Sequence, residues 1–118
     1  DGGTRCASIT GSFIALMLAM KKLRKDKLID QIPIRDYVAA ISVGVIDGKN
    51  LLDLDYSEDS EADVDLNIIK TGSGGFVEIQ GTAEREPFTD KQMKAMLTLA
   101  DKGIKQLITI QKKIIGKL

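Results

Sequence analysis

The amino-acid sequence predicts an α+β fold in which a helix, four mostly antiparallel strands and a second helix follow one another along the chain. Near both ends, apolar residues recur at three- and four-residue spacing, which is the period of an amphipathic helix. Between these segments the pattern changes to β-branched runs and to strict alternation, the period of a strand. This segregation favours helices packed on an antiparallel sheet.

The first predicted helix covers about residues 5–25, and its apolar stripe consists of Ile9, Phe13, Leu16, Met17, Met20 and Leu23. Its last turns carry basic residues between Lys21 and Lys25, where positive charge complements the helix dipole. This basic run is either a solvated helix end or a patch that contacts RNA. The longest uninterrupted apolar stretch, Phe13 to Met20, is shorter than the ~20 residues that span a bilayer, so we expect a soluble protein.

Four strands are predicted in the middle of the chain: Tyr37–Ile46, Leu51–Asp55, Ala62–Lys70 and Phe76–Gln80. The first is nearly all apolar, which fits a strand buried on both faces. Asp47-Gly48 is a two-residue hairpin signal, because both turn positions need positive φ. In the third strand Val64 and Leu66 alternate with Asp63 and Asp65, so one face is apolar and the other acidic.

The second long helix is predicted to begin after Thr89, a good N-cap residue that follows Pro87. Its apolar stripe comprises Met93, Met96, Leu97, Ala100, Ile104, Leu107, Ile108 and Ile114. We interpret this stripe as core and not as a cofactor site.

The composition restricts the chemistry that the chain can perform. With 118 residues, 43% hydrophobic and 29% charged, it has the make-up of one globular domain. Zero net charge argues against a uniformly basic surface for nucleic acid. The lack of histidine excludes Ser-His-Asp and Cys-His catalysis and histidine-ligated zinc. The single cysteine, Cys6, is expected to be a small packed residue and is typical of a reducing, cytoplasmic setting.

Two segments are candidates for chemistry. Asp1-Gly2-Gly3-Thr4-Arg5 places glycines, a hydroxyl and a guanidinium at a helix amino terminus, which suits an anion such as phosphate or is an ordinary glycine-rich helix entry. The second segment is acidic at seven of thirteen positions: Asp53, Asp55, Glu58, Asp59, Glu61, Asp63 and Asp65. Asp59 is predicted to lie in the loop between the second and third strands. Such a run either holds Mg²⁺ or is a solvated loop.

Seven blocks in order along the chain carry a family resemblance. They are Asp1-Gly2-Gly3-Thr4-Arg5, Ala7-Ser8-Ile9-Thr10-Gly11, Ser42-Val43-Gly44, Leu52-Asp53-Leu54-Asp55-Tyr56, Glu58-Asp59-Ser60, Val64-Asp65-Leu66-Asn67 and Gln80-Gly81-Thr82-Ala83-Glu84, followed by Pro87-Phe88. In this order and spacing the chain resembles the second half of ribonuclease PH proteins. It differs from the family pattern at Cys6, where threonine is usual, and at Leu66, where methionine is usual.

The resemblance implies that residues 1–118 are the carboxy-terminal part of a ribonuclease PH domain, one half of a ribosomal protein S5 domain 2-like fold. A start at Asp1, without methionine or leader, likewise suggests a piece of a longer chain. The family's amino-terminal half supplies another phosphate-binding arginine and much of the RNA-contacting surface. We therefore expect the piece alone to be inactive.

By the same resemblance, Gly3, Thr4 and Arg5 bind phosphate, while Asp59 and Asp65 are catalytic and hold Mg²⁺. The implied enzyme is a phosphorolytic 3′→5′ exoribonuclease that trims tRNA precursor 3′ ends, takes part in rRNA processing, releases nucleoside diphosphates and runs in reverse as a nucleotidyltransferase. The implied assembly is a cytoplasmic homohexameric ring that binds RNA and no membrane. The alternative is a non-catalytic RNA-binding ring subunit of an exosome-like assembly, which would be expected to lack Arg5 or one of the aspartates.

Overall fold

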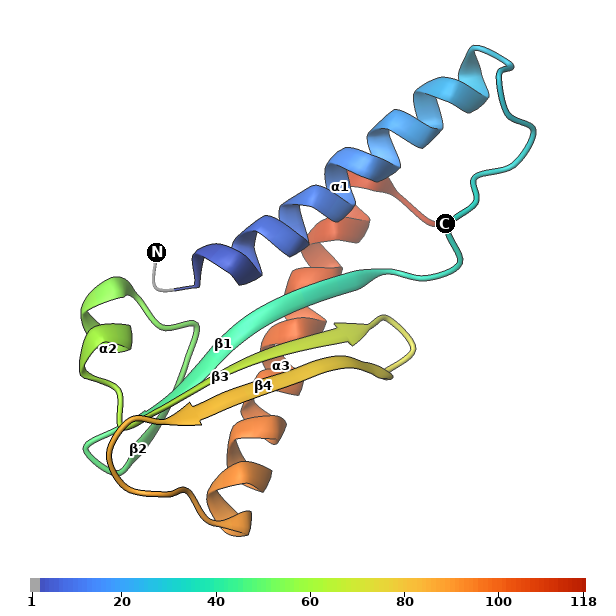
Figure 1. Ribbon diagram of the computed structural model, residues 1–118. Coiled ribbons are helices and arrows are strands. Elements are labelled where there is room, and N and C mark those ends of the chain that lie inside the picture. The colour runs from blue at the N-terminus through green and yellow to red at the C-terminus, as the bar shows by residue number, and fades with distance from the viewer. Residues whose placement is uncertain (1–2) are drawn as a thin grey trace.

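The computed structural model describes residues 3–118, and the predicted order of a helix, four strands and a helix is observed in it (Figure 1). The long elements are α1 (Thr4–Lys25), β1 (Val38–Ile46), β2 (Lys49–Leu52), β3 (Val64–Thr71), β4 (Phe76–Ala83) and α3 (Asp90–Ile115). One short helix, α2 (Tyr56–Glu61), lies between β2 and β3. Asp1 and Gly2, which open the first motif, lie outside the described residues.

The four strands form one antiparallel sheet in the order β2-β1-β3-β4. The hairpin between β1 and β2 turns at Asp47 and Gly48, which both have positive φ (50° and 74°), as the sequence predicts. Along β3, Val64, Leu66 and Ile68 are buried on one face, while Asp65 and Asn67 alternate with them on the other. One face of the sheet is therefore apolar, and the other is polar at Asp65 and Asn67 but packs Ala40 and Ile69 against Cys6 of α1.

The apolar face packs against α3, and Met17 of α1 joins this core together with Met96, Ala100 and Ile104. Thr89 caps α3 through a reciprocal capping box with Gln92. The methionine-containing stripe of α3 is thus core, as expected. Ile114 is a correction, because it is 54% exposed and Ile115 is the buried residue at that end.

The two long helices also cover the part of β1 that β2 does not reach. The Thr10 hydroxyl accepts a hydrogen bond from the Ala40 amide (3.0 Å) and donates to the Ala40 carbonyl (3.2 Å). From α3, the buried Gln111 amide donates to the carbonyls of Val38 (2.9 Å) and Thr10 (3.2 Å). These side chains satisfy backbone groups that a neighbouring strand would otherwise pair.

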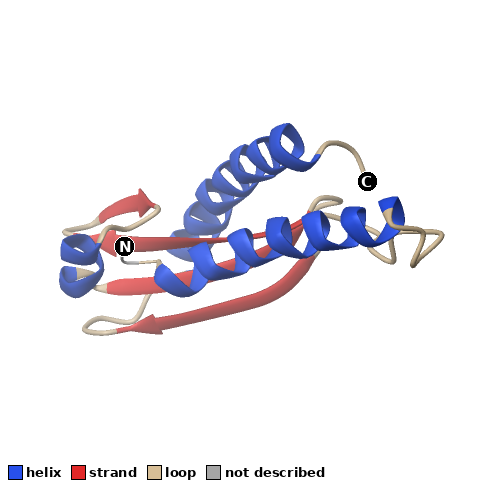
Figure 2. Cartoon of the chain, turned by 90° about the horizontal axis from the view of Figure 1, so that it is seen from above, coloured by secondary structure: helices blue, strands red, loops and turns tan. Residues whose placement is uncertain are grey.

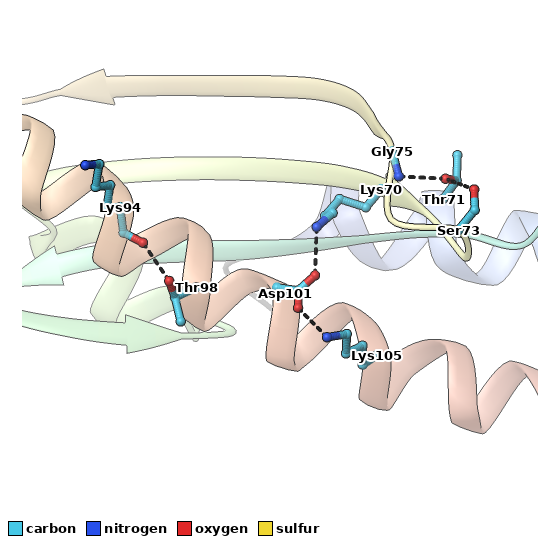
Figure 3. A network of polar contacts seen from close by, with 8 residues as sticks. All are labelled: Lys70, Thr71, Ser73, Gly75, Lys94, Thr98, Asp101 and Lys105. Carbon is cyan, nitrogen blue, oxygen red and sulfur yellow. Dashed lines mark hydrogen bonds and ion pairs between the residues drawn. The ribbon is translucent and has the colours of Figure 1, made fainter.

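A polar contact ties β3 to α3 on the apolar face (Figure 3). The Lys70 side chain is only 10% exposed, and its Nζ lies 2.7 Å from the Asp101 carboxylate, which also pairs with Lys105 Nζ at 2.7 Å. Hydrogen bonds from Lys105 and Lys70 lower the pKa of Asp101. The buried lysine is therefore charge-compensated.

Only a small part of α1 is buried against the rest of the fold. Phe13 and Met17 are buried, but Leu16 of the predicted stripe and Leu18 are 48% and 50% exposed. By length and composition alone, α1 is apolar enough to span a membrane, although its contiguous apolar stretch is short. In this fold, one face of α1 enters the core and another carries exposed leucines. Figure 2 shows α1 lying along the strands of the sheet.

Several element boundaries differ from the sequence prediction: β2 begins at Lys49 instead of Leu51, β3 begins at Val64 instead of Ala62, and β4 continues to Ala83 instead of ending at Gln80. The second strand ends at Leu52 instead of Asp55, and the segment around Asp59 is helical instead of a loop. Asp55 caps this helix by accepting the Glu58 amide (2.8 Å), and the Glu58 side chain accepts the Asp55 amide in return (3.0 Å). The capping box accounts for two carboxylates of the acidic run.

Candidate active site

The candidate site is built on the polar face of the sheet, where the amino terminus of α1 and the short helix α2 meet at one end of the molecule (Figures 1 and 2). The strand register places Ser42 of β1, Asn67 of β3 and Gln80 of β4 side by side. Two residues further along each strand, Gly44, Asp65 and Thr82 are aligned in the same way. The sheet thus supplies a row of polar groups below the helix terminus.

Gly3 precedes α1 and lies directly over Ser42, since a Cβ atom on Gly3 would be 3.2 Å from the Ser42 hydroxyl. No side chain caps this helix end among the described residues. Unpaired amides and the positive end of the dipole make such a terminus suitable for an anion. The structure places Gly3 and Thr4 at this position, as the sequence predicts.

Cys6 anchors the first turn of α1 to the sheet. Its side chain is buried and its thiol donates to the Asn67 side-chain carbonyl (3.4 Å), while the Asn67 amide donates to Gln80 (3.2 Å). Burial raises the pKa of Cys6 to about 11, so the thiolate is scarce at neutral pH. The expected packed role of Cys6 is confirmed.

Arg5 points across the sheet toward its edge strand, β4. Its Nη2 atom lies 2.5 Å from the Glu78 carboxylate, and the two side chains are 50% and 35% exposed. The hydrogen bond and charge of Glu78 raise the pKa of Arg5. Sequence analysis did not identify Glu78, although its even spacing from Gln80 and Thr82 places it on the polar face.

The structure brings together Asp59 and Asp65 from the acidic run. Asp65 projects from β3, and its pKa is raised to about 6 by burial, by a hydrogen bond with the Asp59 carboxyl group, and by the charges of Asp59 and Glu84. Two carboxyl groups at hydrogen-bond distance can share a proton. Glu84 is a second residue that the sequence analysis did not single out.

The burial of Asp65 follows from the chain that crosses above it. Gly44 lies opposite Asp65, and a Cβ atom on Gly44 would be 2.7 Å from both a Leu54 methyl and the Val64 carbonyl. Leu54 is only 1% exposed, and its amide donates to the Ser42 hydroxyl (3.0 Å). Glycine at this position lets the segment before α2 lie close to the sheet and shield Asp65 from water.

The other acidic residues of the run have different roles. Asp63 accepts a hydrogen bond from Arg85 (3.1 Å), and Asp55 and Glu58 cap α2. Asp53 has a positive φ of 57° where the chain leaves β2, and its amide donates to the Ser42 carbonyl (2.8 Å). The acidic run is therefore divided among helix capping, loop contacts and one carboxylate pair.

The carboxylate pair fits a hydrated divalent cation. Asp65 Oδ1 is buried without a hydrogen-bond partner among the described protein atoms, and an unsatisfied buried oxygen is costly. Mg²⁺ prefers oxygen ligands and keeps several waters, so two carboxylates can suffice. No cluster of three or more acidic, cysteine or histidine side chains suited to a metal occurs in residues 3–118.

The fold and the site define a class of RNA-degrading proteins. Residues 36–103, more than half of the chain, match the family described as 3′ exoribonuclease family, domain 2, and the chain belongs to this family. It is 58% identical over 116 residues to ribonuclease PH of Syntrophomonas wolfei subsp. wolfei and 56% identical over 119 residues to ribonuclease PH of Bacillus pumilus. The resemblance stated from the motifs is thus confirmed.

These alignments cover 98% and 100% of this chain but 48% and 49% of the relatives, so it spans about half their length. Two solved structures share the fold at 19% identity. An archaeal exosome core has a TM-score of 0.57 over 70% of this chain and 32% of that chain. The Archaeoglobus fulgidus exosome with RNA bound to the active site has a TM-score of 0.58 over 74% and 35%.

Proposed function

We propose that a full-length protein carrying this chain as its carboxy-terminal half is a phosphate-dependent 3′→5′ exoribonuclease. It trims the 3′ ends of tRNA precursors, releases nucleoside diphosphates and adds nucleotides in the reverse direction. One observation carries the proposal: the amino terminus of α1, which no side chain caps among the described residues, lies at the same end of the molecule as α2, whose Asp59 is paired with Asp65 of β3. Phosphorolysis needs a bound phosphate and a group that assists the departing 3′ oxygen.

The nucleophile is inorganic phosphate, which is already anionic at neutral pH. The chain must therefore bind and orient it more than activate it. The Gly3 amide, the Thr4 hydroxyl and the Arg5 guanidinium would hold the phosphate. One of its oxygens attacks the last phosphodiester, forming a new P–O bond while the bond to the 3′ oxygen of the preceding nucleotide breaks.

The departing 3′ oxygen must gain a proton. With a pKa of about 6, Asp65 is partly protonated near neutral pH and can act as the general acid, with Asp59 sharing its proton. Mg²⁺ held by whichever of the two carboxylates is ionised would neutralise charge on the scissile phosphate. The products are a nucleoside diphosphate and RNA shortened by one nucleotide.

We extend the proposal to the assembly: a homohexameric ring in the cytoplasm that threads RNA and acts with Mg²⁺. The solved neighbours are described as an exosome core and as an exosome with RNA at its active site, and the curated relatives are ribonucleases PH.

The test uses the full-length protein and a tRNA precursor with a short 3′ extension. We expect nucleoside diphosphates to appear only when phosphate is added. Asp59→Asn and Asp65→Asn should each lower the rate on the order of a hundredfold or more. Asp53→Asn, a matched change outside the carboxylate pair, should lower the rate much less.

Equal losses for Asp53→Asn and Asp65→Asn would overturn the assignment of the carboxylate pair. Binding of RNA without any phosphorolysis would instead identify a non-catalytic ring subunit.

A further inference from the structure

The contact between Arg5 and Glu78 joins two parts of the fold that are 73 residues apart in the chain. Arg5 lies in the first turn of α1, and Glu78 lies on the polar face of β4. Arg5 Nη2 donates a hydrogen bond to Glu78 Oε2, and both groups are charged. The Glu78 carboxylate is thus directed at the guanidinium that the proposed reaction uses for phosphate.

The contact leaves most of the guanidinium available. Arginine has five N–H donors, and Glu78 engages only the Nη2 nitrogen. Arg5 is half exposed, and a long exposed side chain otherwise samples many rotamers. A carboxylate that fixes one end of the guanidinium reduces this freedom before phosphate arrives, and such preorganisation increases affinity.

We propose that Glu78 is a positioning residue that orients Arg5 for the incoming phosphate, an inference that rests on the proposed function. The negative charge of Glu78 opposes phosphate binding, but both side chains are partly exposed to water, whose high dielectric constant weakens that repulsion. We expect the gain from orientation to outweigh this repulsion. Glu78 acts through Arg5 and does not itself contact the phosphate.

The experiment measures the KM for phosphate, the KM for RNA and kcat in the full-length protein. We expect Glu78→Ala to raise the phosphate KM about five- to tenfold, with the RNA KM and kcat at saturating phosphate within about twofold of wild type. Glu78→Gln keeps a hydrogen-bond acceptor without the charge, so its phosphate KM should lie between the values of wild type and Glu78→Ala. Glu86→Ala, which removes an exposed carboxylate from the β4–α3 connection, is the matched control and should change none of the three values.

A second arm separates positioning from a structural role. In an Arg5→Ala background, Glu78→Ala should have no further effect on the phosphate KM, because the group that it orients is gone. A structural contribution would persist in that background and would overturn the inference. An unchanged or lowered phosphate KM in Glu78→Ala alone would also overturn it, while leaving the proposed function intact. Absence of phosphate-dependent cleavage by the wild-type protein would overturn both.

Discussion

Asp65 is the residue whose environment most clearly departs from that of an ordinary surface carboxylate. It is shielded by the segment at Leu54 and faces Asp59 and Glu84, and each of these effects raises its pKa. An ionised Asp65 is therefore a cost to the folded state that a proton or a cation relieves.

We predict that Asp65→Asn stabilises the cation-free protein at pH 8 by on the order of 1–2 kcal/mol, after allowance for solvent screening. The folded state holds the Asp65 proton more tightly than the unfolded state, so wild-type stability falls as pH rises from about 4 through about 6. The advantage of the variant should shrink as pH is lowered through this window. Urea unfolding with a chelator at pH 4.5, 6 and 8 checks this, and an advantage independent of pH would contradict it.

At the residue level, the motifs in the sequence located Gly3, Thr4, Arg5, Asp59 and Asp65, and the structure brings the two aspartates together. The partner of Arg5 could not be predicted in the same way. The alternation along β4 places Glu78 on the polar face, but its contact with Arg5 depends on how α1 lies across the sheet, and the sequence carries no signal for that packing.

At the scale of the elements, the packing of α3 against β3 depends on how the buried charge of Lys70 is compensated. Its ammonium is nearly enclosed, lies 4.6 Å from the centre of the Phe76 ring, and has Asp101 as its carboxylate partner. A buried charge that loses its partner is strongly destabilising.

We predict that Asp101→Ala lowers the free energy of unfolding by about 1–2 kcal/mol at pH 7, because it leaves Lys70 unpaired. Lys105→Ala removes the other, 76% exposed partner of Asp101 and should cost less than about 0.5 kcal/mol. The pKa of Asp101 is lowered in the fold, so its contribution is present above the unfolded pKa and is lost in acid. Denaturant titrations at pH 7 and pH 3 measure both effects, and equal costs for the two variants would contradict the assignment.

The long elements were predictable because their periodicity is strong. The apolar run of β1, the hairpin signal at Asp47-Gly48 and the cap at Thr89 all lie where the sequence placed them. The short helix α2 was not predicted, since six polar and charged residues show no apolar stripe. Its one sequence signal was the capping box formed by Asp55 and Glu58, which was interpreted only as part of an acidic cluster.

The molecule as a whole is more extended than a self-contained domain of this length. Its radius of gyration is 16.2 Å, compared with about 13.5 Å expected for 118 residues. α1 carries exposed Leu16 and Leu18, and β4 carries exposed Val77 and Ile79. Apolar surface of this kind is usually covered by another part of the protein or by a partner.

We therefore predict that residues 1–118 expressed alone associate with copies of themselves at micromolar concentration. Leu18→Gln should weaken this association without loss of stability, because the side chain is half exposed in the isolated fold. Leu28→Gln, a matched change in the loop after α1, should not weaken it. Sedimentation velocity across the micromolar range is the measurement, and a clean monomer throughout would contradict the prediction.

The helices that cover part of the edge of β1 also restrict where a further strand can join the sheet. Thr10 and Gln111 form hydrogen bonds with backbone groups of Ala40 and Val38, and β2 pairs with the rest of that edge of β1. An added strand would have to displace two packed helices there. On the opposite side β4, eight residues long, ends the sheet. The other edge strand, β2, has only four residues, so β4 offers the longer edge, and a chain that extends the sheet along most of its length will do so next to the strand that holds Glu78.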